Sequence, residues 1–439
     1  MSEKPIKSKG IGRTFELLKL AARVGLKELQ SGDLNSRVEQ AVLIAKSLSQ
    51  LKGAAMKVGQ LMSLNLDDYF PPEALEVLSQ LQNAATSRPF EEMERVINSE
   101  INGPKRSLIT DISPIPIGVA SIGQVHKACL SGRDIVLKVQ YPKVAESVDS
   151  DLKILKTLAS SFCQLSGRKM QLDDLFKEFQ FILEQELDYG IEAQFQKEFA
   201  EKVKSLNQTS SCLFKVPEIF EDFSGKKVLA MSYEPGLTYR QWLSQNPSRK
   251  DKDQVAVAIL DLYFHEFFEW GLVQTDPNWG NFLIDKKNSD IRIGLLDFGA
   301  SRRYSADFVK KYIALLDLAS QSNPKAFREL AVDMGFIDPR ESEAAFVAFE
   351  DMLKTAIKPF FTQTSGSTFF DFSDRNHTKD SQAVIKALSR ELVYSPPPYS
   401  IVFLHRKLAG VYSILKSLDA KLDISPYWQM MNDLSKRHV

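Results

Sequence analysis

Residues 275–299 read TDPNWGNFLIDKKNSDIRIGLLDFG, in which polar residues stand at the ends of apolar, strand-like runs. Asp276 and Asn281 are separated by four residues, and Asn281 directly precedes the apolar run Phe282–Ile284. Asp297 follows the second run, in the string GLLDFG. A carboxylate at the end of a buried strand is costly unless a charged group pairs with it, and magnesium prefers oxygen ligands that include substrate phosphates. We therefore interpret Asn281 and Asp297 as metal ligands.

The same segment also has a purely structural interpretation. Pro277 and Gly280 lie inside it and suit an Asx-rich turn. Asp297 can likewise cap a turn before the glycine two residues later. Because Asn281 stands upstream at the appropriate place, we favour the metal site over the turn.

Lys138 lies in IVLKV at 135–139 and interrupts an otherwise apolar strand. Because lysine is almost never fully buried unless it is paired, its ammonium group should have a partner; a lysine on an exposed edge strand is the alternative. The lysine, the Asp-x4-Asn string and the Asp-Phe-Gly string occur in the order of a protein-kinase nucleotide site. In such a site the lysine pairs the phosphates and the first aspartate meets the attacking hydroxyl. The asparagine and the second aspartate hold the metal. We therefore predict an enzyme that uses ATP and Mg²⁺.

Composition narrows the class of protein. The 439 residues suit two or three packed units, and the 44% apolar and 26% charged content is that of a globular protein. Lys plus Arg and Asp plus Glu both number 56, so no basic excess supports nucleic-acid binding. The cysteines at 129, 163 and 212 are far apart, which fits a reducing compartment and no metal site.

The N-terminus bears on localisation. Its first 30 residues hold seven Lys/Arg against three Glu, and Phe15, Leu18 and Ala22 recur at helical spacing. Such a basic amphipathic helix can lie on an anionic membrane, although a helix docked on the rest of the protein is the alternative. No apolar run approaches 18 residues, the apolar core of a secretory signal is missing, and Glu3 and Glu16 argue against a transit peptide. We expect a cytoplasmic protein that can associate peripherally with a membrane.

The predicted secondary structure changes along the chain. Residues 1–110 read as helical, 111–235 as strands with inserted helices, and 236–439 as mainly helical. The middle part contains two pairs of strand-like runs. A β-hairpin is predicted from IGQVHKACL and IVLKVQY around the turn SGRD, and a second strand pair from VPEIFED and KKVLAMSYE. EPG at 234–236 then breaks the chain.

Two further polar groups are ambiguous when read from periodicity. Glu186 falls in the middle of an apolar stripe on a helix that begins near Leu172, so it is either a frayed end or a buried acid with a cation partner. Lys57 and Gln60, in KVGQ, lie opposite the apolar stripe of their own helix. Read alone, this second pair suits a solvated face.

Taken together, these strings resemble the UbiB (AarF) family of atypical protein-kinase-like proteins. KVGQ at 57–60 resembles the family's KxGQ signature, PIGVASIGQVH at 116–126 its alanine-rich nucleotide loop, and ELD at 186–188 its ExD signature. The resemblance extends from about Lys52 to Leu408.

The resemblance implies an α+β, bilobal, protein-kinase-like fold with an N-terminal helical extension that covers the active site. Lys138 would be the nucleotide lysine and Glu192 its helix partner. Asp276 would be the catalytic acid, and Asn281 and Asp297 would bind magnesium.

It also implies residues for the lid and for the nucleotide loop. Lys57 and Gln60 would meet Glu186 and Asp188 in a lid over the site, joined by Arg406. The nucleotide site would be lined by these residues: Gly118, Val119, Ala120, Ser121 and Met231.

The chain departs from the family pattern in three places. The family loop typically reads AAAS, whereas residues 118–121 read GVAS, and glycine makes the backbone more permissive near phosphates. TDPNWGN is closer to the mitochondrial-type members than to the usual HADPHPGN. The two C-terminal membrane spans of some bacterial relatives are not expected.

The function implied is an ATPase or small-molecule kinase that supports isoprenoid quinone (ubiquinone) biosynthesis. It would act on or with a lipid precursor at the membrane surface, with quinone-biosynthesis proteins as partners and no nucleic acid. Protein kinase activity is one alternative, which Gly118 supports. A nucleotide-dependent lipid chaperone or scaffold is the other, and the full set of polar residues argues against it.

Overall fold

The computed structural model describes residues 87–120, 122–165, 172–276, 278–321, 323–361, 369–394 and 399–437. The chain forms two compact units. Unit 1 holds residues up to Val96 together with Ile115–Val125 and Val139–Leu187, and unit 2 holds Ile97–Pro114, His126–Lys138 and Asp188–Val439. The helical extension expected over residues 1–110 lies mostly outside the described residues, so the boundaries at 110 and 235 stay predictions.

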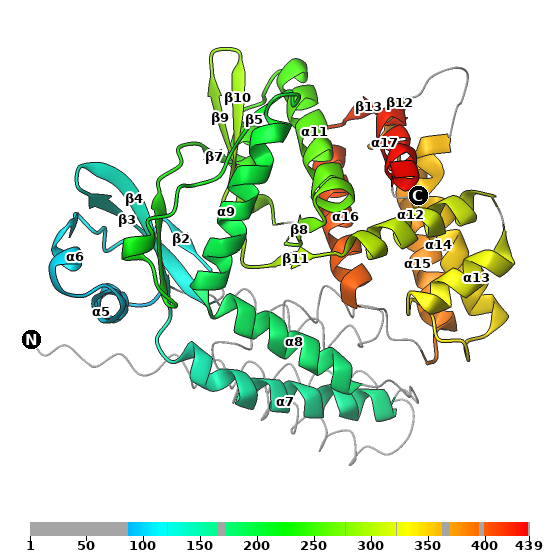
Figure 1. Ribbon diagram of the computed structural model, residues 1–439, viewed down its shortest axis with the longest axis horizontal. Helices are drawn as coiled ribbons and strands as arrows, with labels where there is room; N and C mark the ends of the chain where they lie inside the picture. The colour runs from blue at the N-terminus through cyan, green and yellow to red at the C-terminus, as the bar shows by residue number, and fades with distance from the viewer. Residues whose placement is uncertain are drawn as a thin grey trace, which may run out of the picture. The chain divides into compact units, whose positions relative to one another are not determined.

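Helices and strands alternate through both units (Figure 1), which confirms the α+β class. The α-helices are α5 (Phe90–Glu100), α6 (Gly103–Ser107), α7 (Val144–Leu165), α8 (Leu172–Glu186), α9 (Tyr189–Leu206), α10 (Tyr239–Ser244), α11 (Arg249–Phe264), α12 (Ala306–Gln321), α13 (Pro324–Asp333), α14 (Glu343–Phe361), α15 (Arg375–Glu391), α16 (Tyr399–Ser417) and α17 (Ser425–Arg437). The strands are β1 (Ile109–Thr110), β2 (Gly118–Val119), β3 (Gly123–Leu130), β4 (Arg133–Gln140), β5 (Leu213–Lys215), β6 (Val228–Ser232), β7 (Leu237–Thr238), β8 (Leu272–Gln274), β9 (Phe282–Lys287), β10 (Asp290–Leu295), β11 (Ser301–Arg303), β12 (Phe369–Asp371) and β13 (Lys421–Asp423). Within the described ranges, every helix is too short or too polar to cross a lipid bilayer.

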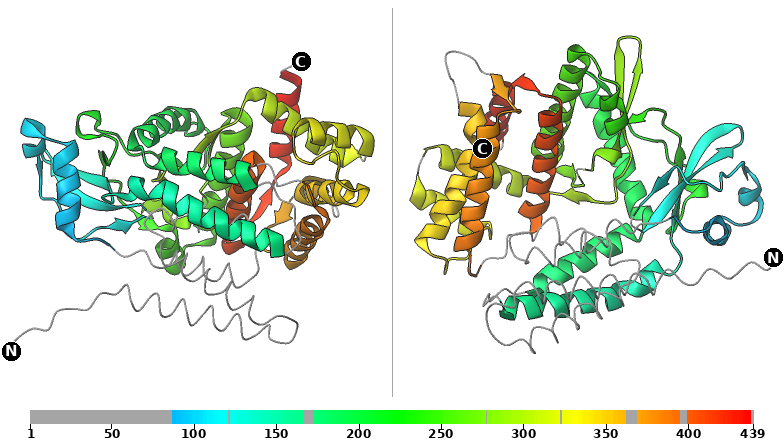
Figure 2. Two further views of the ribbon diagram at one scale, coloured as in Figure 1. Left: turned by 90° about the horizontal axis from the view of Figure 1, so that it is seen from below. Right: turned by 180° about the vertical axis from the view of Figure 1, so that it is seen from behind.

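In unit 1, α7 and α8 pack against each other as an antiparallel pair (Figures 1 and 2). The buried face of α8 carries Phe176, Phe179 and Leu183, which follow the helical period. Glu186 continues this face and is itself buried, which agrees with the buried acid, while its cation partner stays a prediction.

The first sheet has the strand order β1-β3-β4-β6, with β2 paired to β3. The predicted hairpin is confirmed as β3 and β4, joined by Ser131 and Gly132, both of which have positive φ angles of 50° and 84°. A two-residue turn of this kind matches the twist of the flanking strands. Five of the last six residues of β4 are apolar or amide side chains in the core, and Lys138 is the single charge among them.

The second predicted strand pair is half wrong. KKVLAMSYE does contain β6, but VPEIFED contributes only one bridge, between Ile219 and Met231, and then turns into the short 3-10 helix Glu221–Phe223. Pro217 has no N–H with which to continue a ladder, which limits pairing at the start of this segment. The strand that precedes it, β5, instead runs parallel to β10 in the second sheet.

The second sheet, β5-β10-β9-β7, carries the segment with which the sequence analysis began. Strands β9 and β10 form an antiparallel hairpin in which Leu295 pairs with Phe282. Asn281, which precedes β9, and Asp297, which follows β10, therefore lie at the same end of this hairpin. EPG leads into β7, and Gly236 has a φ of 146°, where an added Cβ would lie 3.2 Å from the Ile284 carbonyl oxygen. Glycine is therefore required at this break.

Candidate functional site

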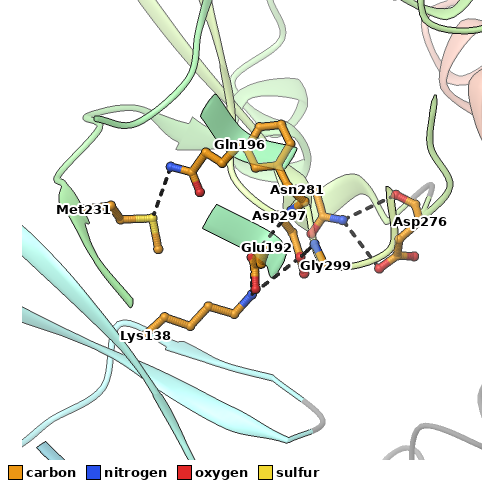
Figure 3. A network of polar contacts seen from close by, with 9 residues as sticks. Lys138, Glu192, Gln196, Met231, Asp276, Asn281, Asp297 and Gly299 are labelled. Atoms are coloured by element: carbon orange, nitrogen blue, oxygen red, sulfur yellow. Dashed lines mark hydrogen bonds and ion pairs between the residues drawn. The ribbon is translucent and has the colours of Figure 1, made fainter. Parts of the chain in front are cut away.

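A buried lysine–glutamate pair lies at the centre of the candidate site (Figure 3). The Lys138 Nζ atom is 2.6 Å from Oε1 and 2.8 Å from Oε2 of Glu192. Lys138 comes from β4 and is 9% exposed, whereas Glu192 lies in the first turn of α9 and is 2% exposed. Asp188 caps this helix by accepting from the backbone N–H of Gly190, which sets where the first turn begins.

The electrostatics of the pair follow from burial. Burial raises the pKa of Glu192 to about 7, against the opposing effect of the Lys138 ammonium group. Burial alone would lower the pKa of Lys138, but the carboxylates of Asp297 and Glu192 together raise it well above its usual value. Lys138 therefore stays cationic at neutral pH, as a group that pairs phosphates must.

Asp276 is held by the loop that follows β8. The backbone N–H of Thr275 donates to the Ala300 carbonyl at 3.1 Å, and its Oγ1 donates to the same oxygen at 2.6 Å. The Asn281 Nδ2 atom lies 3.3 Å from the Asp276 carbonyl oxygen and 3.5 Å from its Oδ2. With this nitrogen turned to Asp276, the amide oxygen of Asn281 is directed to the other side.

The β9–β10 hairpin brings Asn281 beside the residue before Asp297. The Leu296 backbone N–H donates to the Asn281 carbonyl at 3.1 Å. The Asp297 Oδ1 atom accepts from the Gly299 backbone N–H at 3.0 Å and lies 3.5 Å from Lys138 Nζ. Figure 3 shows Glu192, Asp297 and Asn281 grouped between Lys138 and Asp276.

The turn interpretation is confirmed, and the metal interpretation stays a prediction. Asn278 accepts from the Gly280 backbone N–H and Asp297 from that of Gly299, so both Asx turns exist. The side chain of Asp297 nevertheless remains 35% exposed. Across the described residues, no cluster of three or more His, Cys, Asp and Glu side chains could close around an ion. A divalent cation held by Asn281 and Asp297 would therefore need phosphate or water oxygens, which is how magnesium usually binds.

Arg406 contacts the candidate catalytic acid directly. Its Nη2 atom, on α16, lies 3.0 Å from Asp276 Oδ1, and each side chain is 10% exposed. The family resemblance groups Arg406 with the lid residues. Lys57 and Gln60 lie outside the described residues, so that grouping stays a prediction.

The remaining candidates are placed individually. Asp188 caps α9, and its Oδ2 is 3.6 Å from the Nζ atom of exposed Lys226. Gly118 and Val119 form β2, and the Ala120 backbone N–H donates to the Gly123 carbonyl at 2.8 Å. Ser121 lies outside the described residues.

Met231 lies beside Gln196, a buried residue that the sequence patterns did not indicate. Gln196, fully buried on α9, donates from Nε2 to the Pro217 carbonyl at 2.7 Å and lies 3.8 Å from the Met231 sulfur. It follows Glu192 by one helical turn, so both point to the same side of α9. The sequence signal for Gln196 was an amide side chain between Phe195 and Phe199, four positions after Glu192 and therefore on the same face of a helix.

Comparison with known proteins identifies the family. A family model described as "ABC1 atypical kinase-like domain" matches residues 80–331. The chain belongs to the ABC1 atypical kinase-like family. The matched range contains Lys138, Glu192, Asp276, Asn281 and Asp297, and the resemblance to UbiB proteins is confirmed.

Individual relatives support this assignment. The chain is 31% identical to "Atypical kinase COQ8, mitochondrial" of Saccharomyces cerevisiae, over 94% of this chain and 82% of that protein. It is also 31% identical to the protein of the same name from Schizosaccharomyces pombe, over 87% of this chain but only 60% of that protein. The solved structure of an Rv3197–erythromycin complex from Mycobacterium tuberculosis matches with a TM-score of 0.60 and 25% identity, over 88% of this chain and 93% of that chain.

These findings confirm the protein-kinase-like fold and a kinase-like enzyme. One unit brings together the buried Lys138–Glu192 pair, the Asp276 carboxylate and the side chains of Asn281 and Asp297. Lys138 and Asp297 are 159 positions apart in sequence yet 3.5 Å apart in space.

Proposed function

We propose that the protein binds ATP with Mg²⁺ and transfers its γ-phosphate to water or to a small lipid precursor. The observation that carries the proposal is the joint placement of Lys138 with Glu192, and of Asn281 beside the Asp297 segment, in one unit. Lys138 would pair the phosphates, and Asn281 and Asp297 would hold the ion. Asp276 would accept the proton of the attacking hydroxyl.

The proposed biological setting is ubiquinone biosynthesis at a membrane surface. The relatives described above are named atypical kinases of mitochondria, and UbiB proteins support isoprenoid quinone synthesis. The partners would be a lipid precursor, other quinone-biosynthesis proteins and an anionic membrane that the protein touches peripherally. The compartment would follow the membrane on which this pathway operates, which makes a mitochondrial location the alternative to the cytoplasmic one.

ATP hydrolysis by the purified protein tests the chemistry. We expect slow, Mg²⁺-dependent release of phosphate that accelerates with anionic vesicles or quinone-precursor analogues. Asp297→Asn should reduce kcat at least about a hundredfold, because it removes a charged metal ligand. Asp290→Asn, at the exposed start of β10, is the matched control and should leave turnover unchanged. Undiminished turnover in Asp297→Asn would contradict the proposal.

The acceptor distinguishes the proposed reaction from its alternatives. Label from γ-phosphate-labelled ATP in a lipid or in free phosphate supports the proposal, whereas label in a protein side chain supports a protein kinase. A Cβ added at Gly118 would lie 3.8 Å from Val125, an ordinary contact, so nothing in the described backbone demands glycine there. Gly118→Ala should therefore fold normally and restore the first alanine of the family loop. Nucleotide-dependent lipid extraction that survives Asp276→Asn would instead support the chaperone alternative.

A further inference from the structure

A second buried ion pair lies behind the catalytic loop and has no part in the proposed chemistry. The Lys407 Nζ atom is 2.9 Å from Oε2 and 3.3 Å from Oε1 of Glu266. Glu266 is 1% exposed and Lys407 is 2% exposed, so neither reaches a substrate. Burial of a lysine and a glutamate against each other, with almost no access to solvent, needs a reason.

Glu266 stands in an irregular turn. Helix α11 continues into a π-helical turn, His265–Glu269, which closes with the Trp270 N–H donating to the His265 carbonyl at 2.8 Å. Such turns insert one extra residue into a helix and occur often at functional sites. Here the turn places Glu266 towards β8 and α16 at once.

The Glu266 carboxylate joins the two backbones that carry Asp276 and Arg406. It also lies near the backbone N–H of Gln274, two residues before Asp276, which acts to lower the pKa of the carboxyl. Its ion-pair partner Lys407 directly follows Arg406 on α16. One carboxylate therefore lies between the two segments whose side chains make the 3.0 Å contact between Arg406 and Asp276.

The other neighbour of Arg406 is anchored as well. The His405 Nε2 atom is 2.9 Å from the hydroxyl of Tyr312 on α12, and burial lowers the pKa of His405 to about 4. The imidazole is therefore neutral at physiological pH and shares a hydrogen bond with this hydroxyl. Three consecutive residues of α16 thus engage three different partners, and each neighbour of Arg406 has a polar partner of its own.

Stability alone is a poor explanation for the Glu266–Lys407 pair. Replacing a buried ion pair by apolar residues of similar size is often neutral or stabilising, because desolvation offsets the attraction. A defined position of the groups around the pair is the better-attested use.

We infer that Glu266 and Lys407 are positioning residues, whose pairing holds β8 and α16 in the register at which Arg406 meets Asp276. This inference rests on the proposed role of Asp276. The pairing should restrain the backbone of residues 272–281, and this restraint can be measured without any turnover.

The test uses the full-length double variant Glu266→Leu/Lys407→Met, which keeps the volume filled and removes both charges. We expect a folded protein with KM for ATP within about twofold of wild type and kcat lowered about 10- to 100-fold, because small misplacements of catalytic groups cost this much. Amide exchange in residues 272–281 should accelerate. The variant Glu266→Gln/Lys407→Met retains an acceptor for the Gln274 N–H and should recover part of kcat, and it serves as well if the first variant misfolds.

Lys286→Met is the matched control, because it breaks another ion pair of unit 2, that of Lys286 Nζ with Asp251 Oδ2 at 2.8 Å. It should leave kcat and exchange of the loop unchanged. A folded double variant with wild-type kcat and wild-type exchange would overturn the inference while Asp297→Asn still tests the proposed function. If the wild-type protein shows no turnover, the proposed function fails, and the exchange comparison still decides whether the pair positions the loop.

Discussion

The Lys138–Glu192 pair makes one prediction at the level of single residues. Lys138→Met leaves the Glu192 carboxylate buried without its cation, and breaking a buried pair on one side costs about 3–5 kcal/mol. We expect the free energy of unfolding in urea to fall by about this amount, and nucleotide binding to be lost. Lys127→Met is the control, because Lys127 lies on the neighbouring strand with its Nζ 3.7 Å from the Tyr233 ring centre and no buried carboxylate depends on it. An unfolding curve for Lys138→Met that matches this control would contradict the prediction.

Glu266 predicts a pH dependence of stability. Burial raises its pKa to about 7, although Lys407 and the Gln274 N–H oppose the shift; Tyr263 also faces it and stays neutral, because burial raises its pKa too. The folded protein therefore binds a proton that the unfolded chain releases near pH 4.5, so this contribution to stability is present at low pH and is lost as the pH rises through 7. The unfolding free energy of wild type relative to Glu266→Gln should fall between pH 5 and pH 8 by roughly 3 kcal/mol. A difference that rises with pH would show that the pKa is shifted downward.

Some residues could be identified from sequence because their neighbours made them anomalous. Lys138 interrupts an apolar strand, and Asp297 ends one, so both required partners, and both have them. Glu266 and Lys407 gave no such signal, since the charged residues in HEFFEW and LHRKLAG are ordinary for a helix surface. Their burial depends on a π-helical turn and on contacts 141 positions apart, which periodicity does not encode.

At the level of elements, α9 connects the lysine pair to the core. Glu192, Gln196 and Phe199 recur at the helical period along one side of it. The Phe199 ring lies 5.0 Å from that of Phe298, whose backbone N–H is 3.5 Å from Glu192 Oε1. Helix α9 therefore orders both the glutamate and the Asp-Phe-Gly segment.

Phe199→Ala tests this coupling. Removing a fully buried ring should lower the free energy of unfolding by about 3–5 kcal/mol, and the freed α9 should bind nucleotide more weakly. Phe199→Leu keeps most of the volume and should cost clearly less on both counts. The measurements are urea unfolding and nucleotide titration by fluorescence. Loss of stability with unchanged nucleotide affinity would show that α9 does not transmit packing to the site.

Local patterns predicted some elements better than others. The β3–β4 hairpin follows from two β-rich runs and a Ser-Gly turn that are adjacent in sequence. The pairing of β5 with β10 joins residues about 80 positions apart in parallel, and β5 has only three residues. The pairing of β5 depends on tertiary packing, whereas VPEIFED, with its apolar Val216, Ile219 and Phe220, has the more strand-like local pattern.

At the scale of the whole molecule, the chain enters unit 2 three times. Ile97–Pro114 and His126–Lys138 precede the long segment from Asp188. Lys138 is the last residue of the second entry, and its partner Glu192 lies near the start of the third. Lys138, Asn281 and Asp297 therefore belong to one unit, so occupation of the proposed site should stabilise that unit as a whole.

Ligand binding makes this testable by thermal unfolding. A ligand that binds only the folded state at 100 times its Kd adds about 2.7 kcal/mol, which should raise the Tm by several degrees. ATP with Mg²⁺ should produce this shift. Mg²⁺ alone should not, because the described residues offer an ion only Asn281 and Asp297 and leave the rest of its shell to phosphate. Asp297→Asn should abolish the shift and Asp290→Asn should retain it. An equal shift with Mg²⁺ alone would mean that the ion binds elsewhere, and an equal shift in Asp297→Asn would mean that this carboxylate does not hold it.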